Sequence, residues 1–123
     1  MFREPSAEDI AHLVQLAARK VGDFGIKPKV ALLASSNFGA RPSAASRKMR
    51  KALKLLMDEN PALEVEGEMQ ADVAFSPELR QREFPFCKLT GNPNVLIFPD
   101  LNSSNIAYKM LANMTGASLI GPI

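Results

Sequence analysis

The sequence predicts an α/β fold in which a mostly parallel sheet carries helices on both faces. Segments with apolar residues at helical spacing alternate along the chain with short apolar runs typical of strands. Two of those runs are apolar almost without interruption, as expected for parallel strands that are buried on both faces. The length of 123 residues fits a single domain with a core of its own.

The first half of the chain predicts a helix, a strand and a second helix. Residues 6–21 place their apolar side chains on one helical stripe, and Ser6 followed by Asp9 resembles a capping box. The run KVALLAS at 29–35 predicts a buried strand. A polar loop follows it, and the next helix is expected over residues 43–58.

The segment LEVEGEM at 63–69 alternates apolar and acidic residues, which predicts a strand with one solvent-facing side. Alternation would place Glu64, Glu66 and Glu68 together on that side. Since no His or Cys lies near them in sequence, a transition-metal site is not indicated. We expect these carboxylates at a strand edge or paired with basic residues, and a short helix at 70–75.

The second half predicts two more strands around a helix. Residues 76–92 contain two prolines and a glycine, and we expect them to be mostly irregular. NVLIF at 94–98 predicts a buried strand, residues 103–114 a helix, and residues 117–120 a further buried strand. We expect the strands at 29–35, 94–98 and 117–120 in one parallel sheet.

Bulk composition argues against several classes of partner. A net charge of +2 is too small to indicate nucleic acid, and one Tyr with no Trp offers no base-stacking platform. No apolar run reaches the roughly 18 residues of a membrane span, and the N-terminus lacks a signal-peptide pattern. We therefore expect a cytoplasmic protein with no membrane contact. The apolar end SLIGPI suggests that residues 1–123 are a fragment of a longer chain.

The loop after the first strand is the candidate ligand site, because ligands of open α/β sheets lie beyond the C-terminal ends of strands. Small residues would let backbone N–H groups approach an anion, and Arg41 could bind a phosphate through two hydrogen bonds. The same residue types also build ordinary turns and caps, so both interpretations stay open. The candidate binding residues are Ser35, Ser36, Asn37, Gly39, Arg41 and Ser43.

Other reactive or charged residues give weaker signals. The second helix is basic, and its cations fit either a solvated face or a phosphate-binding face; they are Arg47, Lys48, Arg50, Lys51 and Lys54. His12 lies beside an apolar stripe and Cys87 has no neighbouring base in sequence, so we assign no catalytic residue. We assign no metal ligand either.

Three stretches together resemble the phosphate acetyl/butyryltransferase family. They are GEMQADVAF at 67–75, LTGNPNVLIFPDLNSSNIAYKML at 89–111 and the terminal SLIGPI. The resemblance covers residues 29–123. Within the family, the loop at 36–39 (SNFG) and the segment PFCKLTG are most similar to the C-terminal phosphotransacetylase-like domain of large bacterial malic enzymes.

The resemblance implies one lobe of a two-lobed, isopropylmalate-dehydrogenase-like fold with CoA and acyl phosphate in the cleft between lobes. It implies a regulatory and oligomerising lobe, contributing to acetyl-CoA sensing. The parent malic enzyme would oxidatively decarboxylate malate to pyruvate with NAD or NADP and Mg or Mn, at sites in the rest of the parent chain. This lobe alone would hold no cofactor and be inactive. The alternatives are part of a true phosphate acetyltransferase, which moves acetyl between CoA and phosphate, or a stand-alone nucleotide-binding module.

The helix at 103–114 is the candidate contact with a second copy of the chain. It has more apolar surface than one stripe against a sheet requires, and the lobe supplies a dimer interface in the family it resembles. We expect a homodimer or higher oligomer. The candidate interface residues are Ile106, Tyr108, Met110, Leu111 and Met114.

Overall fold

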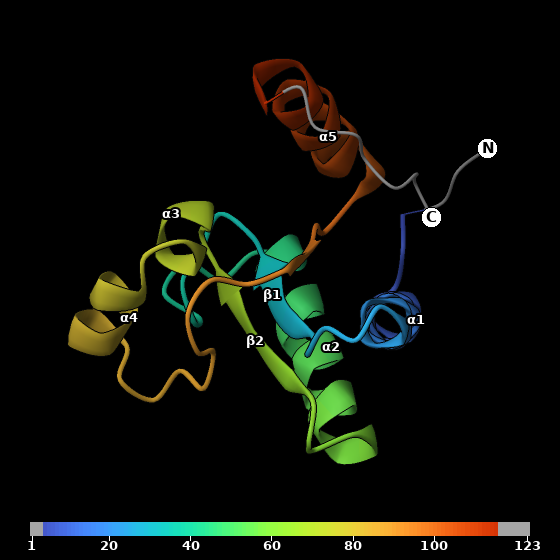
Figure 1. Ribbon diagram of the computed structural model, residues 1–123. Helices are drawn as coiled ribbons and strands as arrows, with labels where there is room; N and C mark the ends of the chain where they lie inside the picture. The colour runs from blue at the N-terminus through green and yellow to red at the C-terminus, as the bar shows by residue number, and fades with distance from the viewer. Residues whose placement is uncertain (1–3, 116–123) are drawn as a thin grey trace.

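The computed structural model describes residues 4–115 and is built on a three-stranded parallel sheet in the order β2-β1-β3 (Figure 1). The strands are β1 (Lys29–Leu33), β2 (Glu64–Met69) and β3 (Val95–Ile97). Two of the three runs predicted to share a parallel sheet therefore do so, which confirms the predicted fold class. The third predicted run, residues 117–120, lies outside the described residues.

Helices cover both faces of this sheet, as predicted. Helices α1 (Ala7–Asp23) and α2 (Ala44–Glu59) pack on one face, and α3 (Ala71–Ala74) and α4 (Pro77–Glu83) lie over the other (Figure 1). Alternate residues of β1 supply the two cores. The core under α1 and α2 includes Ile10, Val14, Val30, Leu32, Met49, Leu56 and Val65. The core under α3 and α4 includes Ala31, Leu33, Met69, Val73, Ala74 and Leu89.

Both long helices begin with reciprocal side-chain caps. At α1, the Asp9 N–H donates to Ser6 Oγ and the Ser6 N–H donates to Asp9 Oδ2, each over 3.0 Å, which confirms the predicted capping box. At α2, the Ser46 N–H donates to Ser43 Oγ over 3.0 Å and the Ser43 N–H donates to Ser46 Oγ over 2.7 Å. These bonds satisfy donors that a helix start otherwise leaves free.

Most of the segment 76–92 is irregular, as predicted, but it also contains helix α4, which was not predicted. Ser76 caps the helix, since its Oγ accepts the Leu79 N–H over 3.2 Å, and Pro77 occupies the first turn. At this position proline loses no helical hydrogen bond, and its fixed φ favours the start of a helix. The Ser-Pro-Glu sequence is thus a start signal rather than a break.

Strand β2 has no solvent-facing side, contrary to the prediction. Five of its six residues are buried, and only Glu66 is half-buried. The segment at 88–90 covers one side of the strand, because the N–H groups of Lys88 and Thr90 donate to Glu66 and Glu64 over 3.0 and 2.9 Å. Helix α2 covers the other side.

The three glutamates of β2 also do not share one face. The pairing of β1 with β2 shifts by one residue near its end, so that Leu32 lies opposite Gly67 while Leu33 lies opposite Met69. A shift of one residue exchanges the two faces of a strand. Glu68 therefore points toward α2 and the loop before it, away from the segment at 88–90.

Helix α5 (Leu101–Thr115) confirms the helix predicted at 103–114 and starts two residues earlier. Figure 1 shows it set apart from the sheet and from the helices that cover the sheet. Its apolar side chains are largely exposed, with Ile106 at 62% and Met114 at 76%. Within residues 4–115, no helix is long and apolar enough to cross a membrane.

Candidate functional site

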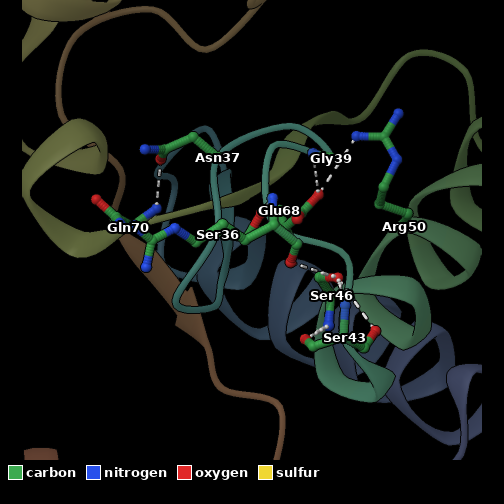
Figure 2. Close-up of polar contacts among 9 residues, drawn as sticks. Ser36, Asn37, Gly39, Ser43, Ser46, Arg50, Glu68 and Gln70 are labelled. Carbon is green, nitrogen blue, oxygen red and sulfur yellow. Dashed lines mark hydrogen bonds and ion pairs between the residues drawn. The ribbon is translucent and has the colours of Figure 1, made fainter.

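The loop at 34–43 joins β1 to α2 at the edge of the sheet where the parallel strands end. Because β1 and β2 run in the same direction, the end of β2 lies beside this loop, and the Ala34 N–H donates to the Met69 carbonyl over 3.0 Å. Figure 2 shows Glu68 and Gln70 together with four of the predicted loop residues, which are Ser36, Asn37, Gly39 and Ser43. The sequence did not single out Glu68 or Gln70 as ligand-site candidates.

Gln70 holds the first half of the loop. Its side-chain amide donates to the Ser35 carbonyl over 3.0 Å, and its backbone N–H donates to Asn37 Oδ1 over 2.8 Å (Figure 2). Asn37 thus has a partner inside the protein, while the Ser35 side chain is exposed.

Glu68 holds the tip of the loop. Its backbone carbonyl accepts the Phe38 N–H over 2.7 Å, and its side-chain Oε1 accepts the Gly39 N–H over 3.0 Å. Phe38 and Gly39 both have left-handed backbone conformations, with φ of 49° and 87°. A bulky residue in this region is strained, so the two bonds to Glu68 stabilise a conformation that Phe38 would otherwise avoid.

The second half of the loop is also bonded internally. The Ala40 N–H donates to the carbonyl three residues before it over 3.0 Å, and the Arg41 N–H donates to Oγ of the buried Ser36 over 2.9 Å. The Ser43 N–H belongs to the α2 cap described above. Each backbone N–H from residue 38 to residue 43 therefore donates inside the protein, apart from Pro42, which has none. A phosphate would meet side chains here rather than these backbone groups.

One arginine of α2 reaches the same carboxylate. Arg50 Nη1 lies 3.3 Å from Glu68 Oε1, and the side chain of Glu68 is completely buried while that of Arg50 is 49% exposed. The second carboxylate oxygen, Oε2, is buried without a hydrogen-bond partner. The Arg41 side chain is exposed at the far end of the loop.

Aromatic rings border the loop on the side of α4. The Phe38 ring lies 5.0 Å from that of Phe84 and 4.9 Å from that of Phe86, measured between centroids. The contact with Phe86 is edge-to-face, an arrangement that aromatic pairs favour. Phe86 is 64% exposed, which gives the loop an apolar border.

The remaining reactive residues lie elsewhere. His12 is exposed on α1. Burial raises the pKa of the half-buried Cys87 thiol above its usual range, which disfavours the nucleophilic thiolate. In the part of the chain that the structure describes, no group of three or more His, Cys, Asp and Glu side chains could hold a metal ion.

Arg80 on α4 is a buried cation that sequence reasoning missed. It is 3% exposed, and its guanidinium donates to the carbonyls of Val73, Ala74 and Gly91. These bonds tie α3 and α4 to the segment that leads into β3, so Arg80 stabilises the fold on that face. A basic residue in the last turn of a short helix is the only sequence signal for this role.

The fold and the loop define an α/β domain of the kind that binds ligands at the C-terminal edge of a parallel sheet. The chain belongs to the phosphate acetyl/butaryl transferase family, whose model matches residues 1–123. This confirms the resemblance found in the sequence.

Individual relatives fall into two groups. Over 119 residues the chain is 46% identical to the NAD-dependent malic enzyme of Rhizobium meliloti (strain 1021), covering 97% of this chain and 16% of that enzyme. It is 40% identical over 123 residues to the phosphate acetyltransferase of Paracoccus denitrificans, covering 98% of this chain and 38% of that enzyme. Among solved structures, the EutD phosphotransacetylase from Staphylococcus aureus matches with a TM-score of 0.88 and 33% identity, covering 100% of this chain and 38% of that chain.

Proposed function

We propose that this chain is the phosphotransacetylase-like lobe of a malic enzyme, where it serves regulation and assembly and contributes to acetyl-CoA sensing. The observation that carries the proposal is the match of nearly the whole chain, at 46% identity, to a malic enzyme of which it spans only 16%. The remainder of such a protein would oxidatively decarboxylate malate with NAD or NADP and Mg or Mn. Those cofactors would bind outside this chain.

The chemistry of the described residues supports a binding role rather than catalysis. The single His is exposed on α1, and the single Cys is half-buried with a raised pKa. Both lie outside the candidate loop, and neither forms a pair of nucleophile and base with a loop residue. The loop instead offers a rigid backbone with cationic side chains at its rim, which suits an anionic ligand.

The second candidate is a lobe of a true phosphate acetyltransferase, favoured by the 40% identity to such an enzyme. The two candidates are separated by assays on the full-length protein. We expect malate oxidation whose rate changes with acetyl-CoA, and no acetyl phosphate from acetyl-CoA and phosphate. Acetyl phosphate formation without malate oxidation would establish the second candidate instead.

Arg41 tests the ligand site within this proposal. Arg41→Ala in the full-length protein should weaken acetyl-CoA binding by roughly 10- to 100-fold, because it would remove a charge-assisted hydrogen bond. Folding should be unaffected, since the side chain is exposed. Titration calorimetry gives the affinity, and Arg19→Ala on α1, which also removes an exposed cation, is the control. Equal affinities for Arg41→Ala and wild type would remove Arg41 from the site.

The assembly role rests on α5. Its exposed apolar residues include Ile106, Met110, Leu111 and Met114, while Tyr108 is half-buried. Covering such a surface with a second copy would remove apolar area from water. Sedimentation of the full-length protein at micromolar concentration should show a dimer or larger species, and Met114→Glu should shift it toward monomer. A monomeric wild type would contradict this role.

A further inference from the structure

The tip of the candidate loop presents an open surface beside Arg50. A side-chain carbon placed on Gly39 would meet no atom within 4 Å, and Gly39 is exposed. The Gly39 N–H and Arg50 Nη1 both reach Oε1 of Glu68, over 3.0 and 3.3 Å, so the guanidinium lies next to the loop tip (Figure 2). The open space over Gly39 therefore lies next to the cationic side chain of Arg50.

The contact between Glu68 and Arg50 leaves most of the guanidinium unused. Only Nη1 bonds to the carboxylate, and the Arg50 side chain is 49% exposed while Glu68 is wholly buried. A two-point arginine–carboxylate pair would engage the guanidinium more completely and give a stronger bond. Here the carboxylate instead restrains the orientation of Arg50, while a large part of its side chain faces solvent.

Further cations lie around Arg50, and no acid offsets them on α2 before its last turn. Arg47 lies three residues earlier, on the same side of the helix, and is exposed. The first acidic residue of α2 is Asp58. Arg47 and Arg50 therefore make this side of α2 cationic, and such a surface attracts phosphate groups.

We propose that Arg50, held in place by Glu68, is the main recognition residue for a phosphate group that lies over Gly39. The basic side of α2 binds the anion, and the backbone N–H groups of residues 38–43 do not, because they already donate inside the protein. Glu68 acts as a positioning residue that orients the guanidinium. The inference rests on the proposed ligand-binding function and names the residue that reads the phosphate of an organic phosphate ligand.

The test is titration calorimetry on the full-length protein with two probes, inorganic pyrophosphate and acetyl-CoA. Arg50→Gln should weaken both by roughly 10- to 100-fold, the loss expected for a charge-assisted bond. Lys54→Gln is the matched control, because it also removes an exposed cation, one turn further along α2. The control should stay within about threefold of wild type, as expected for a charge at the edge of the site.

A second variant guards against loss of folding, since Arg50→Gln leaves a buried charge without its partner. The double variant Arg50→Gln/Glu68→Gln removes both charges, and it should recover stability while phosphate binding remains weak. Arg50→Lys keeps the charge but lacks the planar donor fork, so its affinity should lie between those of wild type and Arg50→Gln.

The outcomes separate this inference from the proposed function. Unchanged affinity for both probes in the Arg50 variants overturns the inference and leaves acetyl-CoA sensing standing. Pyrophosphate binding that Arg50→Gln abolishes, in a protein that does not bind acetyl-CoA, supports the inference and overturns the sensing role. Wild-type protein that binds neither probe overturns both.

Discussion

Two buried glutamates at opposite ends of β2 have different environments. Glu64, at the start of the strand, accepts the Thr90 N–H over 2.9 Å and the Thr90 hydroxyl over 2.9 Å, and lies 3.5 Å from Lys27 Nζ. Glu68, near the end of the strand, accepts one backbone N–H and one arginine, and its second oxygen has no partner. The first carboxylate is well satisfied and the second is not.

The difference follows the direction of the sheet. The N-terminal end of a parallel strand faces away from the ligand-binding edge, so Glu64 lies away from the candidate site. The C-terminal end faces the loops that hold ligands. Glu68 therefore combines a structural task, supporting the loop tip, with a task in orienting Arg50 toward solvent. Incomplete satisfaction of a buried polar group is more common at functional sites than elsewhere.

The largest effect on stability should come from replacing Gly67, which lies between Glu64 and Glu68 in β2. Gly67→Ala would place a carbon 2.6 Å from both Cβ and O of Leu32, at a φ of 153° that disfavours alanine. We expect a loss of about 3–5 kcal/mol in the free energy of unfolding, from overpacking and backbone strain together. Urea denaturation measures it.

The control for that variant is Gly22→Ala in α1, where an added carbon meets no atom within 4 Å. It should change stability by less than about 1 kcal/mol, and in the stabilising direction. Equal stability of the two alanine variants would contradict the tight packing of Gly67 against Leu32 of β1.

A smaller effect is expected at Glu64. Burial alone would raise the pKa of this carboxyl, but the Thr90 hydrogen bonds and then the charge of Lys27 outweigh it, so the pKa lies below its ordinary value of 4.5. A lowered pKa in the folded state stabilises the protein above pH 4.5, and this contribution is lost as the pH falls through the folded-state pKa. Glu64→Gln should cost about 1–2 kcal/mol at pH 7 and flatten the acid side of the stability profile.

Ligand affinity sharpens the contrast between the two glutamates. Glu64→Gln should leave pyrophosphate binding unchanged, whereas Glu68→Gln should weaken it because Arg50 loses its charged anchor. Glu59→Gln, which changes an exposed residue at the end of α2, controls for the loss of one negative charge.

The stability of Glu64→Gln should also differ from that of wild type in its dependence on acidic pH. Identical pH profiles of stability would contradict the stabilising role of the Glu64 carboxylate.

The smallest effect concerns the helix caps. Ser43→Ala and Ser6→Ala each remove an N-cap bond of 3.0 Å, and each should cost about 1 kcal/mol by thermal unfolding. Only Ser43 lies in the candidate loop, so only Ser43→Ala should also reduce affinity for the phosphate probe. Equal affinity in both variants would indicate that the loop position does not depend on the α2 cap.

Local patterns in the sequence predicted most of the elements. The apolar runs at 29–35 and 94–98, the capping box at Ser6 and the stripe of α1 all depend on neighbours within a few residues, and the structure confirms them. Helix α4 was missed although its start signal is local, because Pro77 was taken as a break rather than as a first-turn residue. The predicted loop residues do lie together at the C-terminal edge of the sheet, and ligand binding by them stays a prediction.

By itself the sequence determined the alternation of helices and strands, the parallel sheet and the family, since these follow from periodicity and from long specific motifs. Only the tertiary structure decided the contact between Glu68 and Arg50. Gly67 packs against Leu32, and the pairing shifts by one residue there, which turns Glu68 toward α2. That shift depends on contact between strands more than thirty residues apart, and strand alternation within β2 predicts the opposite face.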